Sequence, residues 1–181
     1  VSHLLREGDY AAGVVISASH NPARDNGIKI LGPGGEKLAD EIERHIEGRI
    51  EEVSAVPGPD LPEVDHHLRE VFVDLLVASH SAAKPLDGLH VVVDAANGAA
   101  SGIARVLFER LGARVEAIAS DPDGHNINDG CGATAPERLA QRVIASRADA
   151  GIALDGDADR VVLVDEKGQV LDGDDILLIW G

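Results

Sequence analysis

The most informative segment of the sequence is a run of alternating carboxylates, Asp155-Gly156-Asp157-Ala158-Asp159-Arg160. Carboxylates at every second position of a turning loop can converge on one cation, and ligation by oxygen alone suits Mg²⁺ or Ca²⁺ rather than zinc. Unpaired carboxylates this close together repel one another and resist ionisation, and a divalent ion relieves that repulsion. We therefore predict a metal site formed by Asp155, Asp157 and Asp159.

Two other interpretations of this run compete with a magnesium-type site. A solvated acidic turn is the simplest, but apolar runs typical of strands lie on both sides and anchor the loop. A helix-flanked calcium loop is the second, because Glu166 follows the three aspartates at the spacing that such a loop requires. Its sharp turn needs a glycine where this sequence has Arg160, and its flanks are helices rather than strands.

A second candidate is the segment Ser17-Ala18-Ser19-His20-Asn21-Pro22, which follows a short β-branched run. Serine is a weak nucleophile unless a base or a cation assists it, and neighbours such as Ser19 and His20 rarely face each other. Polar side chains that only hydrogen-bond their own turn are therefore an open alternative. Lys29 follows on the next predicted strand, which can return it over the loop to take a proton or hold a phosphate.

Three further groups of polar residues carry weaker signals. Asp94-Ala95-Ala96-Asn97-Gly98 lies between a strand and a helix but lacks a glycine-rich dinucleotide fingerprint, so we expect Asn97-Gly98 to shape the turn. His125 and Asn126 lie in a polar loop over 120–136 whose length is typical of functional loops, although it indicates no particular chemistry. Cys131 has no basic neighbour in the sequence that would activate it, and we expect it to be inert.

The elements that must position these residues alternate between strands and helices. Strands are predicted over 13–17, 27–31, 90–94, 114–118, 150–154 and 161–165, and the first is expected to be buried. Helices are predicted over 38–49, over about twenty residues with one apolar face (Leu68, Val71, Phe72, Leu75 and Leu76), and over 99–112 and 137–147. This order indicates an α/β fold of mixed, mostly parallel sheets flanked by helices. Prolines and a glycine within 51–62 indicate a linker.

Composition narrows the class of protein. The 181 residues carry a formal net charge of −16, which disfavours nucleic acids and anionic membranes as partners. A single cysteine, Cys131, excludes an intrachain disulfide and favours a reducing, cytoplasmic location. No apolar run approaches the ~20 residues of a membrane span. The chain has no methionine and stops within an apolar run, which we interpret as a piece of a longer protein.

Three motifs, in their order along the chain, resemble the α-D-phosphohexomutase superfamily, in particular its amino-sugar branch. They are Ser17–Pro22, Asp25–Lys29 and Asp155–Arg160. The resemblance runs over nearly the whole chain and implies part of that family's first domain over residues 1–62, with the phosphoserine loop. It implies the second domain, with the magnesium loop, over residues 63–181. The family's sugar-reading and phosphate-gripping loops belong to two further domains, so we expect this segment alone to be inactive.

The resemblance also implies an activity and a set of site residues. The family interconverts sugar 6- and 1-phosphates, here glucosamine 6-phosphate and glucosamine 1-phosphate, through glucosamine 1,6-bisphosphate, which also activates the enzyme. The catalytic residues implied are Ser19, as a phosphoserine, His20, Lys29 and Arg160. The implied ligands of Mg²⁺ are Ser19, Asp155, Asp157 and Asp159.

Two alternatives to this activity stay open. The substrates could be mannose or glucose phosphates, or the chain could be a non-catalytic metal-binding module. A phosphosugar is the expected partner, with no nucleic acid or membrane, and a homodimer stays open because the sequence does not determine the oligomeric state.

Overall fold

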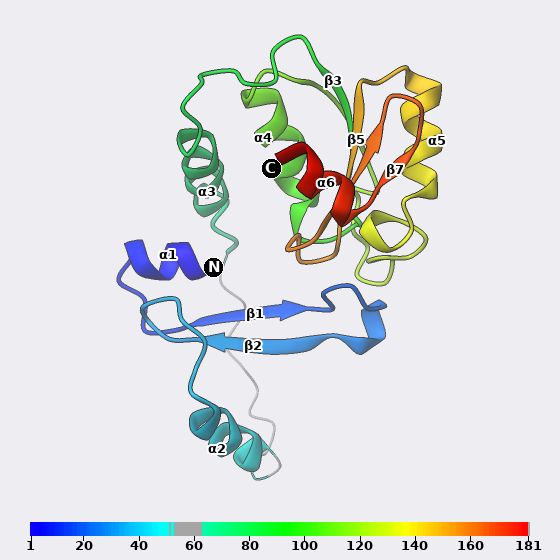
Figure 1. Ribbon diagram of the computed structural model, residues 1–181. Helices are drawn as coiled ribbons and strands as arrows, with labels where there is room; N and C mark the ends of the chain where they lie inside the picture. The colour runs from blue at the N-terminus through cyan, green and yellow to red at the C-terminus, as the bar shows by residue number, and fades with distance from the viewer. Residues whose placement is uncertain (51, 53–62, 181) are drawn as a thin grey trace. The chain divides into compact units, whose positions relative to one another are not determined.

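The computed structural model (Figure 1) describes residues 1–50, 52 and 63–180. They divide into two compact units. One comprises 1–16 and 28–72, and the other comprises 17–27 and 73–181. Residues 17–27, which carry the candidate serine, therefore belong to the same unit as the aspartate loop. The linker predicted over 51–62 lies, apart from residue 52, outside the described residues.

The first unit contains a two-stranded sheet and two helices (Figure 1). Its elements are α1 (Ser2–Glu7), β1 (Gly13–Ser17), β2 (Gly27–Leu31) and α2 (Asp40–Ile50). The arrows of β1 and β2 run in opposite directions in Figure 1, and the two strands pair with each other. The Ser2 hydroxyl donates a 2.7 Å hydrogen bond to the carbonyl of Gly35, which links α1 to the turn after β2. That turn needs glycine, because Gly35 has a φ of 80°.

The strand predicted over 13–17 forms as β1, but the prediction that it is buried is wrong. Val14 is 59% exposed and Ile16 is 72% exposed. These two side chains lie on the same face of the strand, because successive side chains alternate between faces. Among the described residues β1 pairs only with β2, so a sheet of two strands leaves this apolar face in contact with solvent.

The long helix predicted near residue 70 is shorter than expected. It is α3 (His67–Ala78), a helix of 12 residues. The Ser79 hydroxyl donates a 2.7 Å hydrogen bond to the carbonyl of Leu76, a local bond of the kind that competes with helix continuation. The predicted apolar face also differs in part, because Val73 is the buried residue of α3 and Leu75 is exposed.

The second unit is built on a five-stranded sheet with the order β4-β3-β5-β6-β7. The strands are β3 (His90–Asp94), β4 (Arg114–Ile118), β5 (Ala150–Leu154), β6 (Val161–Asp165) and β7 (Val170–Leu171). β3 is parallel to both of its neighbours, β4 and β5, whereas β6 is antiparallel to β5 and β7. This topology confirms the predicted α/β class, and the short β7 is an addition that the sequence pattern did not indicate.

Helices cover both faces of this sheet (Figure 1). α4 (Ala104–Arg110) lies on one face and α5 (Glu137–Ser146) on the other. The unit also contains η2 (Ala99–Gly102), η3 (Gly132–Thr134) and α6 (Gly173–Trp180). Val91 and Val93 of β3 belong to the apolar cluster that contains Ala104 of α4. Val92, which points the other way, packs in a second cluster with Leu139 of α5. Because β3 is buried on both faces, its sequence is a continuous apolar run rather than an alternating one.

Two helical segments of this unit differ from the sequence analysis. The helix predicted over 99–112 begins as the separate 3-10 turn η2, and Ile103, with a φ of −122°, separates it from α4. α6 was not predicted. Asp172 caps its first turn by accepting the backbone N–H groups of Asp174 and Asp175. None of the helices in the described part of the chain has the length and apolar character needed to cross a membrane.

The carboxyl ends of the three parallel strands lie at one edge of the sheet. In register, Asp94 of β3 lies opposite Ile118 of β4 and Ala153 of β5. The segments that follow these strands therefore leave the sheet side by side. In an open α/β sheet this edge is where ligands bind, and it is the edge that carries the aspartate loop.

Candidate metal and phosphoserine site

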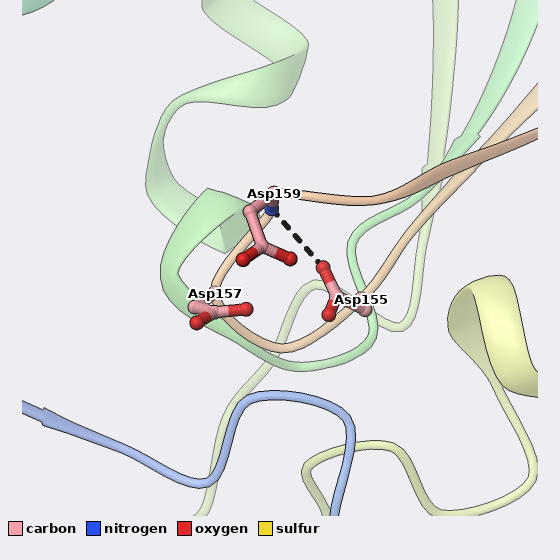
Figure 2. A group of neighbouring side chains, drawn as sticks. All are labelled: Asp155, Asp157 and Asp159. Atoms are coloured by element: carbon pink, nitrogen blue, oxygen red, sulfur yellow. Dashed lines mark hydrogen bonds between the residues drawn. The ribbon is translucent and has the colours of Figure 1, made fainter.

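The three aspartates after β5 converge (Figure 2). Asp155, Asp157 and Asp159 each offer a carboxylate oxygen, and these oxygens lie within 4.8 Å of one another. Asp155 is buried, Asp157 is half-buried and Asp159 is exposed. The structure thus brings together the residues that the spacing singled out, and their role as metal ligands stays a prediction.

Asp155 is the innermost of the three and is only partly satisfied. Its Oδ1 accepts the backbone N–H groups of Asp159 at 3.1 Å and Arg160 at 3.2 Å. Its Oδ2 is buried and has no hydrogen-bond partner among the described residues, although the Arg160 Nε lies 3.6 Å away. Burial raises the pKa of Asp155, the charges of Asp157 and Asp159 raise it further, and the Arg160 backbone hydrogen bond opposes the change. A divalent cation fits this set of donors, because it would partner Oδ2 and offset the repulsion.

Local backbone contacts shape the aspartate loop. Ala158 has a φ of 61°, and its N–H donates to the Asp155 carbonyl at 3.0 Å, which closes a tight turn. The Gly156 carbonyl accepts the N–H of Ala99 at 2.8 Å. A Cβ on Gly98 would lie 2.2 Å from that carbonyl oxygen, so only glycine permits this approach. Gly98 therefore shapes the turn after β3, as the sequence indicated.

Ser19 reaches the aspartate loop from a segment far away in sequence. Its hydroxyl donates to Asp157 Oδ1 at 3.2 Å across 138 positions of the chain. Ser19 has a φ of 50°, a backbone conformation that is uncommon for residues other than glycine. Its N–H donates to the Ser17 hydroxyl at 2.9 Å, so Ser17 supports the turn rather than facing the carboxylates.

Arg160 connects the serine loop with the carboxylates. Its Nη2 lies 3.5 Å from the Ser19 Oγ and 2.7 Å from the His20 Nδ1. Because a guanidinium can only donate, Nδ1 of His20 accepts this bond, and the proton of the neutral imidazole is on Nε2. Arg160 Nε also lies 3.5 Å from Asp159 Oδ1. One fixed positive charge thus faces the serine, the histidine and the acidic loop.

Lys29 lies exposed on β2, in the first unit, and its predicted contribution to acid–base chemistry or phosphate binding stays a prediction. The other predicted residues, Ser19, His20, Arg160 and the three aspartates, all belong to the second unit.

Asn128 is a residue of the site that the sequence patterns did not predict. Its amide nitrogen donates to the carbonyls of Ser19 at 2.7 Å and Asn21 at 2.9 Å. The only signal in the sequence was the length of the polar loop that contains it, and that loop drew attention to His125 and Asn126 instead. The His125 side chain makes no hydrogen bond in the described part of the chain that would connect it to the site, and Asn126 organises its own loop through Asp121 and Asp123.

The buried residues Cys131 and Asp94 lie behind this edge of the sheet. Burial, with a smaller effect of the Asp94 charge, raises the pKa of the Cys131 thiol to about 11, in keeping with an inert cysteine. Burial also raises the pKa of Asp94, against the opposing effect of its backbone hydrogen bonds. Both side chains are fully buried, so we assign them to the core of the fold and not to the ligand-binding surface.

Comparison with known proteins identifies the family. The model of phosphoglucomutase/phosphomannomutase alpha/beta/alpha domain I matches residues 1–56, and that of domain II matches residues 67–168. The chain belongs to the phosphoglucomutase/phosphomannomutase family. Within this family of phosphohexomutases the aspartate loop falls in the part matched by domain II, and Ser19 falls in the part matched by domain I.

Among its relatives in the family are phosphoglucosamine mutases. The enzyme of Pelotomaculum thermopropionicum is 50% identical over 99% of this chain, and that of Halalkalibacterium halodurans is 46% identical over 99% of it. The chain spans 41% of the length of each of these relatives. A solved structure of a putative phosphomannomutase from Thermus thermophilus shares the fold, with a TM-score of 0.76 and 24% identity over 95% of this chain and 40% of that one.

Proposed function

We propose that this chain is the serine- and metal-bearing part of a phosphoglucosamine mutase. The observation that carries the proposal is the 3.2 Å contact between the Ser19 hydroxyl and Asp157, beside a convergent group of three carboxylates. Carboxylates beside an unmodified serine oppose its use as a nucleophile, because their negative charges disfavour deprotonation of its hydroxyl. It suits a phosphoserine that shares a divalent cation with those carboxylates. The identity to curated phosphoglucosamine mutases supports the choice of the amino-sugar substrate.

In this proposal Asp155, Asp157, Asp159 and the Ser19 phosphoryl group hold Mg²⁺. When bound, the cation supplies Lewis-acid stabilisation of the phosphoryl oxygens. The chain's own residues place the reacting groups, which is most of what phosphoryl transfer requires. Arg160 faces the serine oxygen with a permanent positive charge, and it fixes the His20 ring through Nδ1. We assign His20 and Lys29 to proton transfer or phosphate binding near the serine.

The proposed reaction has two balanced half-reactions. In the first, the hydroxyl oxygen of a sugar monophosphate bonds to the phosphorus of the phosphoserine and loses its proton, the bond between that phosphorus and the Ser19 oxygen breaks, and the Ser19 oxygen takes up a proton. The product is glucosamine 1,6-bisphosphate. In the second, the Ser19 oxygen loses its proton and bonds to the phosphorus of the other phosphoryl group, the bond between that phosphorus and the sugar oxygen breaks, and the sugar oxygen takes up a proton. This step regenerates the phosphoserine and leaves the isomeric monophosphate. Because the phosphoserine is regenerated, Ser19 needs no strong permanent base beside it.

The proposal also assigns the two segments of the chain. Residues 1–62 would be the part of the first phosphohexomutase domain that carries the phosphoserine loop. Residues 63–181 would be the second domain with the magnesium loop. The recognition of the sugar and of the non-transferred phosphate would come from the rest of the full-length protein, because the chain spans 41% of the matched relatives.

Activity of the full-length enzyme tests the proposal. With Mg²⁺ and the matching 1,6-bisphosphate, we expect conversion of glucosamine 6-phosphate to glucosamine 1-phosphate in preference to glucose or mannose 6-phosphate. Ser19→Ala should lose at least about 1,000-fold in kcat because it removes the phosphoryl carrier. Ser81→Ala, at an exposed serine of the same unit, should retain activity. Full activity of Ser19→Ala, or a preference for glucose or mannose phosphates, would contradict the proposal.

A further inference from the structure

The loop between β4 and α5 contributes no predicted catalytic residue, yet it is anchored to the edge of the sheet that carries the site. The Asn97 amide nitrogen donates to the Asn126 carbonyl at 3.2 Å, and Asn97 Oδ1 accepts the N–H of Asp121 at 3.2 Å. The N–H of Asn128 donates to the Ala96 carbonyl at 2.9 Å. These bonds attach the loop to the turn after β3, so Asn128 is presented from a fixed position.

We propose that Asn128 is a positioning residue that fastens the loop of Ser19 against the aspartate loop. The two hydrogens of its amide nitrogen meet two carbonyls, that of Ser19 at 2.7 Å and that of Asn21 at 2.9 Å. Because both acceptors are carbonyl oxygens, the orientation of the amide is determined. Its Oδ1 is buried and has no hydrogen-bond partner in the described part of the chain. The two hydrogen bonds donated by the amide nitrogen are therefore the ones that hold this side chain.

Backbone strain shows why the serine loop needs such a fastening. Ser19 has a φ of 50° and Asn128 a φ of 56°, and strained residues keep such conformations only when their surroundings hold them. The Ser17 hydroxyl holds the N–H of Ser19, and Asn128 holds its carbonyl. With both ends of Ser19 fixed, its hydroxyl is directed toward Asp157.

The packing at this point leaves little freedom for the serine loop to shift. A Cβ on Gly156 would lie 2.3 Å from the Ser19 carbonyl oxygen and 2.9 Å from the Asn128 amide nitrogen. The Ser19 carbonyl thus lies between the bare backbone of the aspartate loop and the Asn128 amide. The described hydrogen bonds of the Asn128 side chain go to backbone carbonyls, not to the carboxylates or the serine hydroxyl, so it acts through Ser19.

This inference rests on the proposed function, in which the Ser19 oxygen carries the phosphoryl group. Misplacement of a reacting group by about 1 Å can cost on the order of 100-fold in rate. Loss of the Asn128 amide should therefore lower kcat. It should leave KM nearly unchanged, because sugar recognition is assigned to the rest of the protein.

The test compares variants of the full-length enzyme. Asn128→Gly removes the amide and tolerates the positive φ, and Asn128→Asp keeps the shape but turns a carboxylate toward two carbonyls. His125→Ala, which truncates an exposed side chain of the same loop, is the matched control. We expect kcat to fall about 10- to 100-fold in Asn128→Gly and further in Asn128→Asp, with KM within about twofold. Amide hydrogen exchange over residues 17–22 should rise about tenfold in both variants, with β3 and β5 unchanged.

Three results would overturn the inference. The first is an Asn128→Gly variant whose kcat and whose amide hydrogen exchange over residues 17–22 both equal those of the wild type. The second is a uniform rise in exchange over all strands in both variants, which would show a general structural role. The third is an equal loss in His125→Ala. If the wild-type enzyme has no mutase activity the proposed function fails instead, and exchange over residues 17–22 still decides whether Asn128 fastens the loop.

Discussion

Burial separates the roles of the three aspartates at the level of single residues. Asp155 is buried, and its Oδ2 has no hydrogen-bond partner in the described part of the chain, whereas Asp159 is exposed. A buried carboxylate without a cation is costly to the folded state, because charge is removed from water. In the proposed metal site the same carboxylate would be a ligand whose charge the cation offsets. Asp155 should therefore lower the stability of the metal-free protein and raise its affinity for the metal ion.

This difference predicts opposite effects for one substitution. Asp155→Asn should lower the affinity for Mn²⁺, used as a probe, by at least about tenfold, and it should leave the metal-free melting temperature at or above that of the wild type at neutral pH. Burial raises the pKa of Asp155, so protonation removes the same charge from the wild type as the pH falls through that pKa. The difference in melting temperature should shrink accordingly. Calorimetric titration, and thermal melts from pH 8 to below the ordinary aspartate pKa of about 4, would measure both effects. A difference in melting temperature that widens toward low pH would contradict the assignment.

Cys131 gives a second prediction at this scale. Burial raises the pKa of its thiol to about 11, so at pH 8 only about one molecule in a thousand carries the reactive thiolate. A thiol reagent such as DTNB should leave Cys131 of this chain unmodified in the folded state and modify it fully in denaturant. Rapid stoichiometric reaction of the folded chain at pH 8 would show that the thiol is accessible and activated.

At the scale of elements, the aspartate loop leaves the sheet beside the turn after β3, at the carboxyl ends of two parallel strands. β3 and β5 are neighbours, and their following turns touch where Gly98 meets the Gly156 carbonyl. The serine loop is then pressed against the other side of Gly156. The lack of a side chain at Gly156 is thus a condition for the contact between Ser19 and Asp157.

Gly156→Ala should consequently disconnect the two loops. A Cβ there would lie 2.3 Å from the Ser19 carbonyl oxygen and 2.7 Å from Ile127 Cδ1, and the backbone carbonyl cannot yield without moving Ser19. We expect a loss of about 100-fold in kcat in the full-length enzyme. Gly173→Ala is the control, since a Cβ at Gly173 meets no atom within 4 Å among the described residues. Equal activity of the two variants would contradict this account of the loop contact.

Most elements of the second unit could be predicted because their signals are local. β3 is a β-branched run between turn residues, and the alternation of strands and helices indicates the class of the fold. The exposure of Val14 and Ile16 could not be read from β1, because apolar strand residues look the same whether or not a neighbour covers them. Asn128 escaped for a related reason. Its partners are carbonyls of Ser19 and Asn21 more than 100 positions away, and backbone acceptors carry no sequence signature.

At the scale of the whole molecule, the net charge predicts which partners the chain does not bind. The formal net charge is −16, and a surface of that sign repels polyanions. The chain should therefore show no binding to duplex DNA in fluorescence anisotropy at about 0.15 M salt, with Mg²⁺ present to occupy the acidic loop. Saturable binding that weakens steeply with salt would reveal a basic surface that the sequence does not indicate.

We propose that one metal site assembles from residues far apart in the sequence. In this site one divalent cation would be held by the Ser19 phosphoryl group together with Asp155, Asp157 and Asp159. The most direct measurement is the phosphorus-31 resonance of the phosphoserine in the full-length enzyme during titration with paramagnetic Mn²⁺. We expect stoichiometric Mn²⁺ to broaden this resonance beyond detection in the wild type and to leave it sharp in Asp157→Asn at the same concentration. A resonance that stays sharp while the wild type binds Mn²⁺ would contradict this proposal.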